Sequence, residues 1–318
     1  MAKTRGEDRG QLAPRLAEAR ERLLAERSKR VRPLRDDKVI TAWNGLMISA
    51  FAYGFQVLDD PAYRTAAERA ARFLLDHLRT PDGRLLRRYR DGQASFAGYI
   101  DDYAFFVMGL LDLYEATFYP DHLAAAIDLA GKMEELFWDD QDGGFTFQGS
   151  DGEELLVRQK EVYDGAIPSG NSVAALALLR IGGLTADPDR EARGRRTIDA
   201  FSGDVSQAPS AFTQMLIALD YAIGPAVEIV LAGEPDAKET KEMVRAIHDR
   251  FLPNKVVALR PEGLAGDRIA GLAPFLADHR AVGGKTTAYV CRNHACSLPT
   301  GDPAEMLRLI EDRGRPSP

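Results

Sequence analysis

Cysteine is scarce in this sequence. Its 318 residues include only Cys291 and Cys296, too few for the framework of bridges that holds small secreted proteins together, so we expect a cytoplasmic, reducing location. The two form a Cys-x4-Cys pattern with His294 between them. Even if His279 joined, a clear four-ligand zinc set would be lacking. We therefore expect two ordinary thiols and no metal site. A disulfide between them is geometrically conceivable, but a reducing cytosol disfavours it.

Positive charge is also in short supply. Lys and Arg number 41 against 48 Asp and Glu, a net charge of −7, which argues against a dedicated nucleic-acid binder. The basic residues gather in residues 1–38, where the net charge is +5. Leu12 to Arg30 predicts an Arg-rich helix, too rich in Glu for a transit peptide and without the apolar core of a signal peptide. We expect a solvated helix packed on the main domain.

Long hydrophobic runs are nearly missing. The one exception, Val39 to Leu58, has twenty residues without a charge, which is the minimum length for a membrane helix. It contains Asn44, Gly45 and Gly54, and a helix that is apolar all round is equally expected at the centre of a large helical protein. We predict a buried helix in a protein that does not enter the membrane.

The sequence lacks one motif that is typical of serine hydrolases and another that is typical of dinucleotide-binding enzymes. The sequence has neither a Gly-x-Ser-x-Gly elbow nor a Gly-x-Gly-x-x-Gly fingerprint, which leaves serine hydrolases and dinucleotide enzymes without support. Gly284-Lys285-Thr286 resembles the end of a phosphate-binding loop, but it leads into a predicted strand and not a helix. We expect no cofactor.

A repeated pattern of helices is present instead. Apolar helices are predicted to begin near residues 41, 100, 169 and 210, with amphipathic helices after the first three. Short hairpins are predicted over 84–96, turning at Asp91-Gly92, and over 145–157, turning at Asp151-Gly152. An apolar helix that alternates with an amphipathic one is what two concentric helix layers require. The pattern predicts a mainly α protein, an α/α-hairpin toroid.

The pattern changes near Pro225. Beyond it, strands alternate with helices, which predicts a small α/β module. The expected organisation is therefore a basic N-terminal helix (1–35), a toroid region (36–225) and a C-terminal α/β module (226–318).

The predicted beginnings of the inner helices carry long motifs. They read Asp36-Asp37-Lys38 with Thr41-Ala42-Trp43-Asn44-Gly45-Leu46-Met47, Asp101-Asp102-Tyr103-Ala104, Tyr163-Asp164-Gly165-Ala166 with Pro168-Ser169-Gly170-Asn171-Ser172, and, near the C-terminus, Ala288-Tyr289-Val290-Cys291. Together these motifs resemble the thioredoxin-domain-containing proteins related to spermatogenesis-associated protein, from about residue 12 onward.

The resemblance implies an N-terminal thioredoxin-like domain with a Cys-x-x-Cys-type site, followed by an (α/α)6 toroid similar to six-hairpin glycosidases. This sequence has no Cys-x-x-Cys, and about eight helices precede residue 225 where a full toroid needs twelve. We therefore expect a partial toroid, corresponding to the C-terminal half to two-thirds of such a protein. A separate thioredoxin-like half is the partner that the resemblance implies.

Carboxylates at the helix mouths suggest carbohydrate chemistry. Glycoside hydrolysis needs an acid and a base or nucleophile about 5–9.5 Å apart, and Asp102 and Asp164 stand at the mouths of successive inner helices. Asp37 and Asp101 are alternates, and Glu161 is close in sequence. The predicted substrate-binding residues are Trp43, Asn44, Tyr103, Ser169 and Asn171, with Tyr99 as a further aromatic face.

Three alternatives stay open. The same acids favour helix N-caps, and side chains buried in backbone hydrogen bonds would contradict catalysis. The protein is then a non-catalytic scaffold or sugar-binding module for a thioredoxin-like partner. A sugar epimerase or isomerase is less favoured, because none of the five histidines lies at a predicted inner-helix mouth.

Overall fold

The computed structural model describes residues 8–224 and 226–312, and of Arg9 only the backbone. The chain divides into two compact units, Met1–Lys38 and Val39–Pro318, and each is described by itself. In the first unit, α2 (Arg9–Ser28) forms the helix expected there, with Asp8 accepting a hydrogen bond from the amide of Gly10 at its start.

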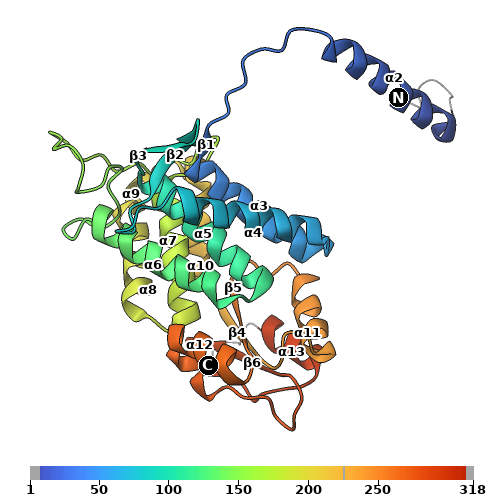
Figure 1. Cartoon of the computed structure of the whole chain (residues 1–318). Helices are drawn as coiled ribbons and strands as arrows, with labels where there is room; N and C mark the ends of the chain where they lie inside the picture. The colour runs from blue at the N-terminus through green and yellow to red at the C-terminus, as the bar shows by residue number, and fades with distance from the viewer. Residues whose placement is uncertain (1–7, 225, 313–318) are drawn as a thin grey trace. The chain divides into compact units, whose positions relative to one another are not determined.

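The second unit begins with a run of helical hairpins (Figure 1). The first helix of each hairpin packs on the first helix of the next, and the second helix covers it from outside. The helices are α3 (Thr41–Leu58), α4 (Pro61–His77), α5 (Ile100–Thr117), α6 (Pro120–Phe137), α7 (Gly170–Thr185), α8 (Pro188–Ala200), α9 (Ser202–Gln207) and α10 (Thr213–Ile223).

The layers agree with the pattern of apolar residues. The inner helix α5 buries nearly every residue along its length, whereas the outer helix α4 buries only Ala67, Ala71 and Leu74. The inner helices begin at residues 41, 100, 170 and 213, within a few residues of the predicted positions. The mainly α fold with a partial toroid of α/α hairpins is thereby confirmed.

The same three-residue turn joins the inner helix to the outer helix in the first three hairpins, α3–α4, α5–α6 and α7–α8. Asp59, Phe118 and Ala186 each end an inner helix in the left-handed conformation, with φ of 54°, 56° and 56°. Two residues later a proline opens the outer helix in all three cases. Proline suits the first helical turn because its missing N–H has no intrahelical partner there. The turn is therefore repeated although the sequences of the units differ.

A three-stranded antiparallel sheet connects the first two hairpins. Its strands are β1 (Val39–Ile40), β2 (Leu86–Arg90) and β3 (Gln93–Ala97), in that order. Asp91 and Gly92, with φ of 51° and 78°, form the turn between β2 and β3. The first predicted hairpin is confirmed.

The second predicted hairpin, over 145–157, is wrong. Residues of this stretch bond to the end of α6, because Thr146 and Ser150 donate their amides to the carbonyls of Phe137 and Leu136. Only an isolated bridge, between Trp138 and Phe145, involves this stretch among the described residues. Residues 146–168 form an irregular loop.

The second unit ends in an α/β layer. Its elements are β4 (Val227–Ala232), α11 (Lys238–His248), β5 (Lys255–Arg260), α12 (Gly263–Leu272), β6 (Thr287–Arg292), β7 (Ala295–Cys296) and α13 (Pro303–Glu311). The strand order is β5-β4-β6-β7, with β4 and β5 parallel and the other pairs antiparallel. The module predicted after residue 225 is present, with α12 as an additional helix; Pro225 itself lies outside the described residues.

The two faces of this sheet belong to different cores. Ile229 and Leu231 of β4 pack with residues of α11 and α13, while Val230, between them, packs with the core of the hairpins. This alternation follows from the two-residue period of a strand. One face of the sheet therefore joins the helical hairpins directly.

A buried ionic network strengthens that junction. Arg180 of α7 contacts Asp112 at 2.6 Å and Glu115 at 2.9 Å, both on α5, and Glu115 also contacts Lys255 of β5 at 2.9 Å. Burial alone would raise the pKa of Glu115, but Lys255 and Arg180 outweigh it and lower that pKa. Two acids and two bases thus compensate one another inside the molecule. The sequence analysis did not identify this network.

None of the helices within the described residues combines the length and the apolar character that crossing a bilayer requires.

Candidate functional site

Asp101 is the carboxylate best placed for chemistry at the mouths of the inner helices. It lies in the first turn of α5 and accepts a hydrogen bond from the amide of Gly170, at the start of α7. Its side chain is partly buried. Burial and the nearby charge of Glu161 raise the pKa of Asp101 to about 6, against the opposing effects of Gly170 and Arg87. A carboxyl group with such a pKa is partly protonated near neutral pH, as a general acid must be.

Glu161 is the second carboxylate of this site. It is exposed in the irregular loop before α7, and its charge is, after burial, the second cause that raises the pKa of Asp101. Asn171 holds the loop in place by donating its side-chain amide to the carbonyls of Glu161 and Phe145, both at 2.8 Å. The position of Glu161 is therefore fixed from within the helix layer.

An aromatic and cationic surface lies beside this pair. Arg87 of β2 places its guanidinium 4.8 Å from the centre of the Tyr99 ring, and Tyr99 stacks on Phe147 with ring centres 4.6 Å apart. From Phe147 the loop to Gln159 encloses an open hollow of about 900 Å³. Its lining includes Gln148, Glu153 and Arg158 as well as apolar side chains. Flat rings next to polar groups suit a sugar ligand.

Trp43 and Asn44 lie at the beginning of α3. The indole of Trp43 is 59% exposed, so its face is free to stack on a ligand. Asn44 donates its side-chain amide to the carbonyl of Ile40 at 2.9 Å, one helical turn back. Of these two predicted binding residues, Trp43 keeps an available surface and Asn44 is occupied in part by its own helix.

The structure contradicts a catalytic role for Asp102. Its side chain is completely buried, and its two oxygens accept from the amides of Ala42 at 3.0 Å and Tyr99 at 2.9 Å. Burial raises the pKa of Asp102 to about 6, against the hydrogen bond from Tyr99 and the charge of Arg87, 3.6 Å away. Asp102 is therefore the carboxylate that ties the start of α3 to the start of α5.

The same reasoning corrects the prediction for Asp164. One oxygen accepts from the amide of Ser169 at 2.9 Å, and the other accepts from Gln214 at 2.8 Å and Met215 at 3.0 Å, at the start of α10. Helix N-termini present free amides that a carboxylate satisfies well. Asp164 is thus a capping residue shared between two segments, which was the alternative to catalysis.

Three predicted binding residues are also occupied inside the protein. Tyr103 is buried, and its hydroxyl accepts from the amide of Leu85 at 2.7 Å. Ser169 caps α7 by accepting from Ser172, and Asn171 is fully buried in the contacts described above. The binding predictions for Tyr103, Ser169 and Asn171 are therefore wrong, because these polar groups serve the backbone. Asp37 belongs to the first unit, Met1–Lys38, and its catalytic assignment stays a prediction.

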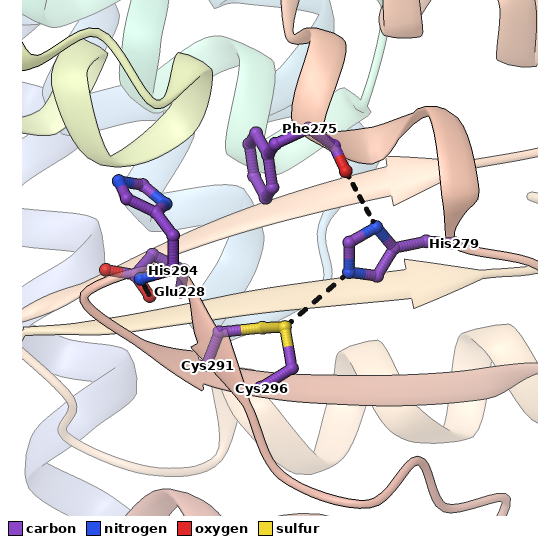
Figure 2. The surroundings of a disulfide bond; sticks show 6 residues. All are labelled: Glu228, Phe275, His279, Cys291, His294 and Cys296. Carbon is purple, nitrogen blue, oxygen red and sulfur yellow. Dashed lines mark hydrogen bonds between the residues drawn. A yellow bond between two sulfur atoms is a disulfide. The ribbon is translucent and has the colours of Figure 1, made fainter.

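The prediction of two free thiols is wrong as well. Cys291 and Cys296 form a disulfide between β6 and β7, drawn in Figure 2. They are directly opposite each other in the strand register, which brings the sulfurs together. His279 does join them, with its Nε2 3.7 Å from Sγ of Cys296. If reduced, the three side chains would offer a metal three ligand atoms within 4.8 Å of one another.

Comparison with known sequences gives relatives that are much longer than this chain. No family model matches the chain. It is 37% identical over 300 residues to spermatogenesis-associated protein 20 of Homo sapiens and of Rattus norvegicus, and 28% identical over 306 residues to an uncharacterized protein of Caenorhabditis elegans. These matches cover 91%, 91% and 92% of this chain but only 38%, 38% and 40% of the relatives. The chain thus spans well under half of their length.

Solved structures with a similar arrangement include two carbohydrate-active enzymes. A GH76 α-mannanase of Bacteroides thetaiotaomicron aligns with a TM-score of 0.49 and 15% identity, over 76% of this chain and 70% of that one. A cellobiose 2-epimerase of Bacillus thermoamylovorans aligns with a TM-score of 0.46 and 20% identity, over 54% and 46%.

Proposed function

We propose that the mouths of the inner helices form a carbohydrate site, with Asp101 and Glu161 as its acid–base pair. The observation that carries this proposal is the difference between the two groups: the carboxyl group of Asp101, in the first turn of α5, is partly buried with its pKa raised to about 6, in part by the charge of Glu161, and Glu161 itself is exposed. Two carboxylates in unequal surroundings are the minimum equipment for glycoside hydrolysis.

The roles follow from the surroundings of each group. Asp101, held by the amide of Gly170, donates its proton to the oxygen of the leaving group. Glu161, in the solvent-facing loop, acts as the base that activates water or as the nucleophile. Arg87 and the aromatic faces of Tyr99 and Trp43 orient the sugar rings. The reaction needs no group from outside the chain apart from the glycan and water.

A panel of oligosaccharides tests this proposal. The wild-type chain is incubated with each glycan between pH 5 and 7, and released reducing ends are measured. Asp101→Asn should reduce turnover by at least about 100-fold, the usual contribution of a general acid. Glu161→Gln should be similarly impaired.

The matched control is Asp76→Asn, an exposed aspartate on the outer helix α4. It should keep wild-type turnover, and circular dichroism should show that all variants are folded. Equal turnover by wild type and Asp101→Asn would refute the catalytic assignment.

A scaffold role is the second candidate, and the surface of α3 favours it. Trp43, Met47, Tyr53 and Val57 are between 48% and 59% exposed and repeat at helical spacing along one face. Such a stripe is what an inner helix presents to the next helix of a toroid. In this case the occupant is a helical segment of a separate chain. Val57→Asp should abolish that association without affecting glycan turnover, whereas Asp101→Asn should reduce turnover and leave the association intact.

A further inference from the structure

His279 faces the disulfide in one defined tautomer. Its Nδ1 lies 3.1 Å from the carbonyl oxygen of Phe275, and a carbonyl can only accept, so Nδ1 carries the hydrogen. Nε2 then holds a lone pair, directed at Sγ of Cys296 at 3.7 Å (Figure 2). A sulfur in a disulfide has no proton to donate, so this lone pair is unused while the disulfide is intact.

The two sulfurs differ in their access to solvent. Cys291 is completely buried in β6, whereas Cys296 is exposed in β7. An incoming thiolate can therefore reach Cys296 alone, and Cys291 must be the leaving group. The imidazole lies beside the sulfur that is attacked, and one of its ring nitrogens is also within 4.8 Å of Sγ of Cys291.

The Cys291–Cys296 disulfide adds little to the stability of the hairpin that β6 and β7 form. Cys291 and Cys296 are five residues apart, and closing so short a loop removes little entropy from the unfolded chain. A two-residue turn at Asn293 and His294, with φ of 50° and 60°, already sets the hairpin. The amide of Ser297 also bonds to the carbonyl of Val290 at 2.9 Å.

We propose that Cys291–Cys296 is a thiol–disulfide exchange site in which His279 transfers the proton. The co-reactant is a dithiol. One of its thiols gives its proton to Nε2 of His279, and the thiolate sulfur attacks Sγ of Cys296. The bond to Cys291 breaks, its electron pair stays on Sγ of Cys291, and that sulfur takes the proton from Nε2.

The second step completes the exchange. The other thiol of the co-reactant attacks its own sulfur in the mixed disulfide and releases Cys296, which takes up the remaining proton. Two electrons and two protons have then moved from the dithiol to the cysteine pair, and the co-reactant has become a disulfide. In the reverse direction the reduced pair reduces a disulfide substrate.

The protonation state of His279 suits this role near neutral pH. Burial lowers the pKa of His279 below its ordinary value, with Asp278 opposing and Arg260 assisting. The disulfide sulfur of Cys296 carries no proton, and the phenol ring of Tyr289, with its centre 4.6 Å from that of the imidazole, also packs against His279. The imidazole is therefore neutral at pH 7 and available as a base.

The rate of reduction by dithiothreitol tests the proposal. Thiols formed at Cys291 and Cys296 are trapped with iodoacetamide at successive times and located by peptide mass spectrometry. His279→Gln should slow the reduction at pH 7 by at least about tenfold, a lower bound below the roughly 100-fold or more that general acid–base catalysis typically contributes. His294→Gln is the control, because the His294 ring also packs on Phe275 but its Nε2 faces Glu191, 3.7 Å away, whereas Nε2 of His279 faces the disulfide.

The pH profile separates proton transfer from a structural effect, and it works with the wild type alone should His279→Gln not fold. With proton transfer by His279, the wild-type rate changes much less than tenfold per pH unit between pH 6 and 8. A rate that follows the thiolate concentration of dithiothreitol, tenfold per unit, would overturn the proposal. So would equal rates for His279→Gln and wild type, or a protein purified in air in which both cysteines are alkylated without reduction.

Discussion

Asp101 and Asp102 are neighbours in the first turn of α5, yet their carboxyl groups face different surroundings. Asp102 gives both oxygens to backbone amides of other segments, while Asp101 lies between Gly170 and the charge of Glu161. Adjacent residues on a helix point in directions about 100° apart, so one can serve the scaffold and the other the surface. This difference gives predictions at the scale of single residues.

The first prediction compares the two amide substitutions. Asp101→Asn keeps the acceptor for Gly170 and removes a partly buried charge. At pH 7 it should raise Tm by roughly 2–4 °C, the effect of about 1 kcal/mol in a chain of this size. In Asp102→Asn, the new –NH₂ group would face an amide N–H and leave it unsatisfied, at a cost of about 1–3 kcal/mol. Thermal unfolding measures both, and a loss of stability in both variants would contradict the distinction.

The pH dependence of the first effect has a definite sign. The pKa of Asp101 is about 6 in the folded chain against an ordinary value of 3.8, so between these pH values the folded state binds more protons than the unfolded state. Its contribution to the free energy of unfolding then falls as the pH rises through this window. The advantage of Asp101→Asn over wild type should therefore be present at pH 7 and vanish near pH 4. An advantage that is independent of pH would contradict the assigned cause.

Glu161 provides a separate test of the pair. Because its charge raises the pKa of Asp101, Glu161→Gln should lower that pKa toward its ordinary value. Carboxyl-carbon NMR with labelled aspartate measures the titration directly, with Glu153→Gln, in the same loop, as the control. An unchanged titration of Asp101 would mean that the two groups are not neighbours.

The helices themselves are held together by close backbone contact and by buried charge. A Cβ atom on Gly45 of α3 would lie 2.5–2.7 Å from backbone atoms of Phe105 and Phe106 on α5, and one on Gly109 would lie 2.6 Å from the carbonyl oxygen of Gly45. The two helices cross where each has a glycine. This contact explains Gly45 in the motif that follows Trp43, which capping alone does not.

Alanine at this crossing should therefore be costly. We expect Gly45→Ala or Gly109→Ala to destabilise the chain by about 1–3 kcal/mol or more, because backbone atoms cannot move aside as a side chain can. Gly271→Ala in α12, where a Cβ meets nothing within 4 Å, should instead be neutral or stabilising. Urea unfolding of the three variants provides the comparison. Equal effects at all three positions would show that helix propensity alone is involved.

The buried ionic network around Arg180 gives a second prediction about how helices and strands are held together. Arg180→Met leaves Asp112 without its cation and Glu115 with Lys255 alone, and breaking a buried pair in this way costs about 3–5 kcal/mol. Arg193→Met, which removes a more exposed contact to Glu134, should cost less than about 1 kcal/mol. Adding Asp112→Asn to Arg180→Met should recover part of the loss. If Arg180→Met were as stable as Arg193→Met, the network would not support the junction of hairpins and sheet.

The elements that sequence reasoning predicted are those with a clear period. The apolar pattern on all sides of α5 predicted its place in the inner layer, and the one-sided pattern of α4 predicted its place in the outer layer. The Asp91-Gly92 turn predicted the hairpin of β2 and β3. The loop over 146–168 could not be predicted, because its backbone groups bond to the end of α6 and to the side chain of Asn171 and not to a second strand within the loop. Nor could the disulfide, because its formation depends on a strand register that brings Cys291 opposite Cys296.

At the scale of the whole molecule, the arrangement of hairpins places several helix beginnings in one region. The motifs there were identified from the sequence, but the sequence did not show which of their side chains bond to the backbone. Short polar residues at a helix beginning can cap it or face a ligand, and the choice depends on side-chain direction. Asp102, Asp164 and Asn171 bond to backbone groups of other segments, while Asp101 is only partly buried and Trp43 is exposed.

The central claim is that these helix mouths bind carbohydrate, and Trp43 reports on it directly. The chain has two tryptophans, so Trp138→Phe leaves Trp43 as the only one. Its fluorescence is then followed while oligosaccharides are added. The account predicts a saturable change in emission for at least one glycan, and the loss of that change in Trp43→Phe. Glycan binding, seen by calorimetry, that leaves the emission of Trp43 unaltered would contradict it.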